Sequence, residues 1–194
     1  MTTETFFQLH YHLTDTERLF DLAQGIAAQR RRLKKHDVRC RSFQWFSRRL
    51  LWQGIVLLVL GALLLWLTAS LTLGRVSGAL TGLCFGCGVL ELVLCAFMRR
   101  NYRRSWRQFQ QQNDPDGCIL FDGSGIREEN RKGKPTHFDW KDWDVAVVTP
   151  KVIVLTFRVP VLLFFPYSEE AAITVAHAAR AFGKEDAVVY RQRI

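Results

Sequence analysis

Two long apolar segments in the middle of the chain restrict its possible folds more than any other feature. The first runs from Leu50 to Leu73, and the second runs from Val76 to Met98 with Glu91 as its one charged residue. A helix needs about 20 apolar residues to cross the hydrocarbon core of a bilayer, and both segments are that long. The alternative is a buried helical pair in a soluble protein, but such helices carry a polar face, and Ile55–Leu67 has none. The two segments therefore predict a transmembrane helical hairpin.

The charges around these segments predict the orientation of the hairpin, whose tight turn falls at Gly74 and Arg75. Residues 1–49 hold ten Lys/Arg and five Asp/Glu, residues 50–98 hold one of each, and residues 99–194 hold sixteen and twelve. The net charges are thus +5, 0 and +4 within the total of +9. Positively charged flanks stay in the cytoplasm, so we expect both termini there. The first 13 residues lack the charged start and apolar core of a signal peptide, so we expect the first span to direct insertion.

Basic and aromatic residues next to the spans favour contact with the membrane surface. The basic run Arg30–Lys35 is followed by Phe43, Trp45 and Phe46, a combination that suits an interfacial segment, although a solvated extension of the first span is the alternative. Because these clusters adjoin membrane spans, the lipid bilayer and anionic headgroups explain them better than nucleic acid, and we expect no nucleic acid partner. The residues expected at the membrane interface are Trp45, Arg48, Arg49, Arg99 and Arg100.

Neither the cysteines nor the histidines form a strong metal-binding pattern. Cys84 and Cys87 have the spacing of a metal or redox motif, but they lie within an apolar span, where small residues more often serve helix packing. His10 and His12 fall on one face of an alternating segment without a third ligand in view. Disulfides are not expected on the cytoplasmic side. We therefore expect no metal and no cofactor.

The segment before the first span predicts a strand followed by a helix. Residues Thr5–Leu13 alternate between apolar and polar side chains, which is typical of a strand with one buried face. Thr14 and Glu17 fit a capping box, so we expect a helix from about Thr16 to Gln29.

Small residues and one acid distinguish the second span. Gly78, Gly82 and Gly86 lie four residues apart on one helix face, where a second helix can approach closely. This face predicts packing of the hairpin on itself, or equally a homodimer. Glu91 is the one ionisable residue at depth, and Gln53 or Arg49 could come within its reach. We interpret Glu91 as structural rather than as part of an ion pathway, because the two spans supply few other polar residues.

The C-terminal part predicts a small antiparallel sheet closed by a helix. A polar helix continues from Arg99 to Gln112, and turn-forming residues at 113–117 mark a domain boundary. The expected strands are Cys118–Phe121, Ile126–Glu129, Thr136–Trp140, Trp143–Thr149, Val152–Phe157 and Val161–Phe165. Ser168 caps the expected final helix, and Gly183 ends it. We expect an α+β membrane protein with an N-terminal part (1–49), a hairpin (50–98), a helical linker (99–116) and a cytoplasmic domain (117–194). The N-terminal strand could pair at the open edge of the sheet.

The order of these parts resembles the YcxB-like family of bacterial membrane proteins. The matching stretches are "YHLTDTERLF", the two spans, "CILFDGSGIREEN", "HFDWKDWDVAVVTPKVIVLTF" and "FFPYSEEAAITVAHAARAFG". Members often have "IPW" where this chain has Phe138-Asp139-Trp140. The resemblance implies a C-terminal domain similar to pleckstrin-homology domains, a curled sheet with a capping helix, in the bacterial cytoplasmic membrane. It supplies no activity and no catalytic residues.

Two functions remain open at this point. The first is a membrane-anchored binding module whose ligand contacts are Arg127, Arg131, Lys132 and Lys134, although a solvated loop would look the same. The second is an assembly or regulatory subunit that docks in a larger complex through Glu91 and the glycine face. An enzyme is not expected, because no nucleophile motif or phosphate-binding loop is present.

Overall fold

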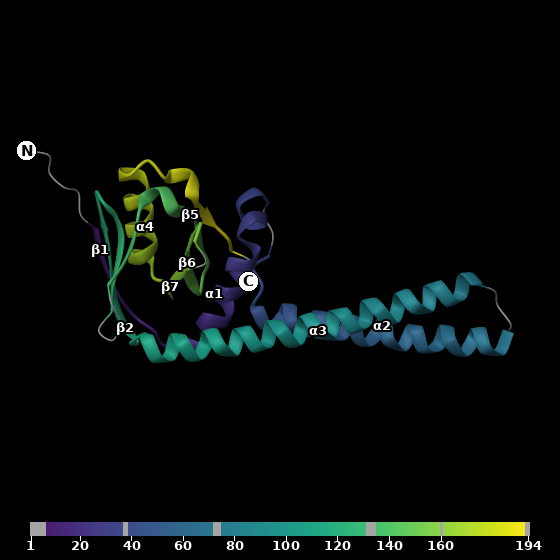
Figure 1. The fold of residues 1–194 in the computed structure, drawn as a ribbon. Coiled ribbons are helices and arrows are strands. Elements are labelled where there is room, and N and C mark those ends of the chain that lie inside the picture. The colour runs from purple at the N-terminus through teal and green to yellow at the C-terminus, as the bar shows by residue number, and fades with distance from the viewer. Residues whose placement is uncertain (1–6, 37–38, 72–74, 131–134, 160, 193–194) are drawn as a thin grey trace, which may run out of the picture. The chain divides into compact units, whose positions relative to one another are not determined.

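The chain forms two compact units that differ in architecture. The computed structural model describes residues 7–36, 39–71, 75–130, 135–159 and 161–192. Unit 1 comprises residues 1–43 and 106–194, and unit 2 comprises residues 44–105. Two four-stranded sheets and a C-terminal helix belong to unit 1, and two long apolar helices packed together form unit 2, so the α+β class is confirmed (Figure 1).

The first sheet contains the N-terminal strand and follows the order β1-β2-β3-β4. All neighbouring strands are antiparallel, and β1 pairs with β2 from Phe7 opposite Phe121 to His12 opposite Asp116. The predicted pairing of the N-terminal strand with the C-terminal sheet is therefore confirmed. The strands are β1 (Phe7–His12), β2 (Asp116–Asp122), β3 (Gly125–Asn130) and β4 (Thr136–Phe138).

The second sheet follows the order β7-β6-β5-β8, in which only the β5–β8 pair is parallel. Its strands are β5 (Trp143–Val148), β6 (Val152–Phe157), β7 (Leu162–Pro166) and β8 (Val188–Tyr190). The first three match the sequence predictions closely. The short strand β8 was not predicted, because three residues are too few to show an alternating pattern. The predicted strand through Trp140 ends earlier, at Phe138, and a 3-10 turn (Trp140–Asp142) leads into β5.

The two sheets enclose one core on which the C-terminal helix also packs. The helix α4 (Glu169–Ala181) begins where Ser168 Oγ accepts a hydrogen bond from the Ala171 amide at 3.0 Å. It ends before Gly183, whose φ of +66° suits the left-handed residue after a helix. Both predicted helix ends are confirmed. The largest fully buried side chains of this core are Phe121, Phe157, Phe165, Ile119, Ile126, Ile153 and Leu155.

The helix α1 (Thr16–Lys35) covers the other side of the second sheet and contacts β5, β6 and β7. Every residue of β6 is buried, because β6 lies between the core and this helix. The predicted capping box is wrong, since the helix starts after Asp15 in a left-handed conformation (φ 53°) and no side chain caps it. The helix continues past its predicted end at Gln29. A Cβ at Gly25 would lie 2.0 Å from the Arg41 carbonyl oxygen, so the following chain crosses α1 at this glycine.

Unit 2 consists of most of α2 (Phe43–Leu71) and α3 (Arg75–Gln112). Both helices are long and apolar enough to cross a membrane. Their large apolar side chains are widely exposed, including Trp52 at 66%, Leu83 at 62% and Phe97 at 61%, which is unlike the core helices of a soluble protein. The last turns of α3 belong to unit 1, where Trp106 and Phe109 pack on Phe20 with ring centroids 5.1 and 5.2 Å apart.

Candidate functional site

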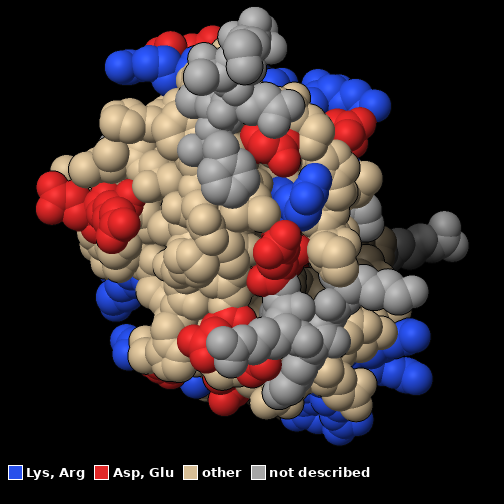
Figure 2. Space-filling model, turned by 90° about the vertical axis from the view of Figure 1, so that its left-hand side faces the viewer, with Lys and Arg blue, Asp and Glu red and all other residues tan. Residues whose placement is uncertain are grey.

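A groove on the outer side of the first sheet contains the one described residue of the predicted ligand site. Its volume is about 350 Å³, and its lining residues are Ser124, Arg127, Glu129, Pro135 and His137. Arg131, Lys132 and Lys134, the other predicted contacts, lie outside the described residues. Figure 2 shows the side of unit 1 on which β1 and β2 lie, where acidic and basic side chains are interspersed.

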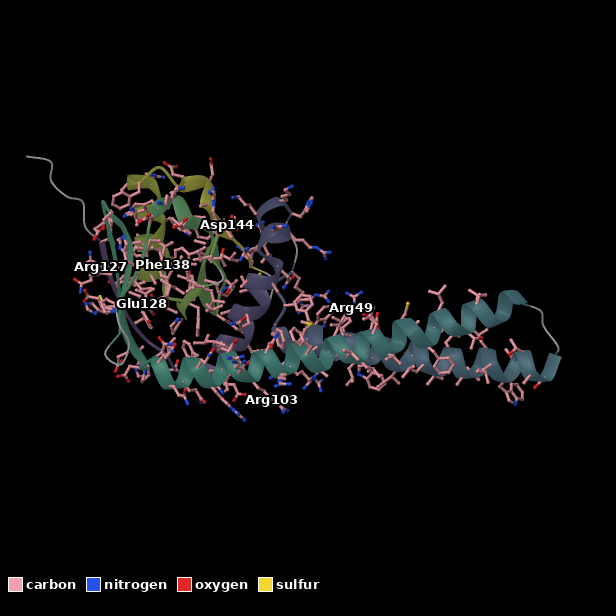
Figure 3. The ribbon with its side chains drawn as sticks, viewed as in Figure 1. Arg49, Arg103, Arg127, Glu128, Phe138 and Asp144 are labelled. Carbon is pink, nitrogen blue, oxygen red and sulfur yellow. The ribbon has the colours of Figure 1, made fainter. Side chains whose placement is uncertain are left out.

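Strand geometry explains why Arg127 faces the groove. Successive side chains of a strand point to opposite sides, so Ile126 points into the core while Arg127 points outward. Figure 3 shows Arg127 at the outer edge of the sheet and Phe138 in the interior. Arg127 pairs with His137 across the β3–β4 ladder, which brings two nitrogen-rich side chains together.

Carboxylates lie beside both of these side chains. Arg127 Nη2 lies 3.7 Å from Asp122 Oδ2, and His137 Nε2 lies 3.4 Å from Asp139 Oδ1. Burial alone would raise the pKa of Asp122, but hydrogen bonds from Ser124 and Gly125, together with the Arg127 charge, lower it below its ordinary value. Asp122 also fixes the predicted hairpin turn, because its Oδ1 accepts from the Ser124 amide at 2.7 Å and the Gly125 amide at 3.1 Å. Arg127 is 43% exposed, so its guanidinium remains accessible to an anion.

A half-buried tyrosine–glutamate pair was not predicted from the sequence. Tyr11 donates a hydrogen bond to Glu128 Oε1 at 2.8 Å, and the tyrosine ring stacks on Phe165. Burial raises the pKa of Glu128 above its ordinary value. The hydrogen bond from Tyr11 lowers this pKa, but by a smaller amount. Burial also raises the pKa of Tyr11. The alternation of β1 places Tyr11 on the inner face, but only the tertiary structure shows that its partner is a carboxyl group.

The basic run in the last turns of α1 has a structural role that the interfacial interpretation missed. Arg30 Nε and Lys34 Nζ lie 3.4 and 3.6 Å from the carboxylate of Asp144 on β5. The Arg191 guanidinium donates to the carbonyl oxygens of Leu33 and His36 at the end of α1. Two of the cations expected at a membrane surface therefore hold α1 on its sheet.

The two helices of unit 2 meet at Gly54 on α2, one of the two glycines expected to take part from the first span (Gly54 and Gly61), but at Gly88 rather than the predicted glycines on α3. A Cβ at Gly88 would lie 3.0 Å from the Gly54 carbonyl oxygen, and one at Gly54 would lie 3.1 Å from the Gly88 carbonyl oxygen. A Cβ at Gly78, Gly82 or Gly86 would meet no described atom within 4 Å. The prediction that the hairpin packs on itself through these three glycines is therefore wrong. Their face is open, so contact with a second chain stays a prediction.

Glu91 lies on α3 with one carboxylate oxygen buried. Among the described residues, Glu91 Oε2 has no hydrogen-bond partner. The expected contact of this oxygen with Gln53 or Arg49 is not formed, and Gln53 is exposed. Cys95, one helical turn further on, donates from Sγ to the Ser47 carbonyl oxygen at 3.2 Å and joins the two helices.

The predicted interface residues gather at the end of unit 2 opposite the hairpin turn. Arg48 and Arg49 lie on α2, Arg99 and Arg100 lie on α3, and all four are exposed. Figure 3 shows Arg49 and Arg103 projecting from the helices. The Arg49 guanidinium lies 5.5 Å from the centre of the Trp45 ring, a cation–π distance.

Comparisons with known proteins give no further guide to these sites. No protein-family model, curated protein or solved structure matches the chain significantly. Within the described residues, no three His, Cys, Asp or Glu side chains are placed to hold a metal ion. The groove combines the Arg127 guanidinium and the His137 imidazole with the carboxylate of Glu129.

Proposed function

We propose that this protein is a membrane-anchored, non-enzymatic binding or scaffold module with a pleckstrin-homology-like cytoplasmic domain. The observation that carries the proposal is the position of the hairpin in the sequence, between β1 and β2. These two strands are neighbours in one sheet, although the whole of unit 2 separates them along the chain. Because unit 1 is one compact fold, both ends of a membrane-spanning hairpin must emerge on the same side. The excess of Lys/Arg on the flanks favours the cytoplasmic side of a bacterial inner membrane.

Strand order supports the pleckstrin-homology-like assignment. Seven strands run through two sheets in the order β1-β2-β3-β4 and β5-β6-β7, and a C-terminal helix packs on the core. The YcxB-like resemblance of the sequence implies the same arrangement. In this proposal α1 and β8 are additions, one covering the second sheet and the other extending it.

The ligand surface that we propose is the groove beside Arg127. Its guanidinium can exchange the 3.7 Å contact with Asp122 for a closer, bidentate contact with a phosphate or carboxylate group. His137, on the neighbouring strand, can donate a second hydrogen bond. We infer an acidic group on a protein, peptide or headgroup as the ligand.

An assembly subunit is the second candidate, and the open glycine face of α3 favours it. Gly78, Gly82 and Gly86 allow close approach of another helix, and the neighbouring Leu83 and Leu90 are exposed at 62% and 58%. In this case a second copy or an unknown membrane protein would cover the face.

Recovery of partners from membranes in mild detergent separates the two candidates. Arg127→Glu should abolish recovery if the groove binds the partner, whereas Gly82→Leu should abolish it if the hairpin does. Arg180→Glu, at an exposed site on α4, is the matched control for the change in charge. Labelling of a tag at either terminus from outside intact cells would contradict the proposed topology.

A further inference from the structure

Arginines gather on α2 and α3 at the end of unit 2 that contains residues 44 and 105. Arg99, Arg100, Arg103 and Arg104 are all exposed on α3. At 100° per residue they fall within about 140° of one another around the helix. The only acidic residue in the sequence from 44 to 105 is Glu91. Together with Arg48 and Arg49, these four residues are called the arginine collar.

The contacts between α2 and α3 fix the level of each member of the collar. Gly54 lies against Gly88, and Ser47 accepts a hydrogen bond from Cys95. This antiparallel register puts Arg48 level with residue 94. At 1.5 Å per residue, Arg99 lies about 7.5 Å and Arg103 about 13.5 Å beyond that level.

Exposed apolar side chains show where a membrane boundary falls along these helices. Phe97 is 61% exposed, and in the same register it lies level with Trp45. The boundary of the hydrocarbon therefore falls just beyond this level. Arg99 and Arg100 then lie in the headgroup layer, which is about 5–7 Å thick on each side. Arg103 and Arg104 lie farther out, but their distance from the phosphates is still within the Debye length of about 8–10 Å, so their charges still act on the phosphates.

Arg49 lies inside this boundary but extends toward it. Its guanidinium is 5.5 Å from the ring of Trp45, which is one helical turn closer to the boundary. A long cationic side chain at the end of a membrane helix behaves in this way when its charge reaches for the headgroups. Arg49, Arg99 and Arg100 therefore present their charge at the headgroup layer, and Arg103 and Arg104 present theirs just beyond it.

We propose that the arginine collar binds the phosphate groups of anionic phospholipids, so that the protein selects these lipids from the surrounding bilayer. The inference rests on the proposed membrane-spanning function. Guanidinium groups pair well with phosphates, and the one acidic residue within residues 44–105, Glu91, lies eight residues, or about 12 Å, before Arg99 along α3. Arg103 and Arg104 add charge beyond the four arginines expected at the interface from the sequence.

The test is the selectivity of the full chain for spin-labelled phosphatidylglycerol over spin-labelled phosphatidylcholine in reconstituted vesicles. An arginine near an anionic surface is worth about a fivefold change in binding. We expect the wild type to select phosphatidylglycerol at least about fivefold and the variant Arg99→Gln/Arg100→Gln/Arg103→Gln/Arg104→Gln to lose this preference. The selectivity should also fall in 1 M salt, where the Debye length is about 3 Å.

The matched control removes the same charge from exposed basic residues of unit 1 that lie outside the basic run of α1: Arg18→Gln/Lys151→Gln/Arg158→Gln/Arg180→Gln. This variant should keep the selectivity of the wild type. If the control loses as much selectivity as the collar variant, or if the wild type shows none, the proposal that the collar binds anionic phospholipids is overturned. The membrane-spanning function would remain intact in both cases. Absence of motionally restricted lipid around any of the proteins would instead overturn the membrane-spanning function itself.

Discussion

The contact between Gly54 and Gly88 predicts opposite effects for two substitutions of the same kind on one helix. Gly88→Ala places a Cβ 3.0 Å from the Gly54 carbonyl oxygen and 3.0 Å from Leu58 Cγ. Gly82→Ala places the same atom where no described atom lies within 4 Å. Gly88→Ala should therefore destabilise the hairpin and Gly82→Ala should stabilise it.

The magnitudes follow from two competing terms. Both substitutions stabilise the helix by about 0.5–1 kcal/mol, because alanine loses less conformational entropy than glycine when a helix forms. Carbon atoms pack favourably at about 3.5–4.0 Å, so the methyl group at position 88 must push the helices apart or distort them, at about 1–3 kcal/mol. Gly88→Ala should be less stable than Gly82→Ala by about 1–3 kcal/mol.

Cys95 supplies a local measurement of this difference. It is 2% exposed and bonded to Ser47, so its thiol reacts only when the two helices separate. With the other four cysteines replaced by alanine, thiol labelling of the detergent-solubilised protein against temperature reports the opening of unit 2. A difference of about 1–3 kcal/mol should separate the labelling midpoints of the two variants by about 2–10 °C. If Gly88→Ala is protected to the same temperature as Gly82→Ala, the helices do not meet through Gly54 and Gly88.

Three further predictions concern unit 1. Glu128→Gln should raise the free energy of unfolding at pH 7. Burial raises the pKa of Glu128, so the folded protein loses stability as the pH rises above 4.5, the ordinary pKa of this carboxyl group. In urea unfolding at pH 4, the variant and the wild type should be equally stable. Gly25→Ala should lower the free energy of unfolding, measured with urea, by about 3 kcal/mol or more, because the new Cβ would overlap the Arg41 carbonyl group. Equal stability of the variant and the wild type would show that the chain at Arg41 does not cross α1 at Gly25. Arg191→Ala should lower the free energy of unfolding by about 1–2 kcal/mol, because it removes the hydrogen bonds to the carbonyl oxygens of Leu33 and His36. Unchanged amide exchange at the end of α1 would show that Arg191 does not hold this end of the helix.

Local sequence patterns determined the elements that depend on neighbouring residues. The apolar lengths of 50–73 and 76–98 predicted two long helices, and α2 and α3 contain them as far as the described residues extend. The strand β6 and the turn at Asp122 also followed from local patterns, because period, turn chemistry and capping act over a few residues. The capping box was the exception, since a left-handed Asp15 starts α1 instead.

Tertiary structure alone decided which faces meet. Gly88 carries no signal that distinguishes it from Gly78, Gly82 and Gly86, because every glycine permits close approach and only the rotation of α3 selects one face. The pairing of Arg30 and Lys34 with Asp144 joins residues more than 100 positions apart, beyond the reach of any local pattern. For the same reason, the hydrogen bond between Tyr11 and Glu128 could not be predicted from the sequence and was found only in the folded structure.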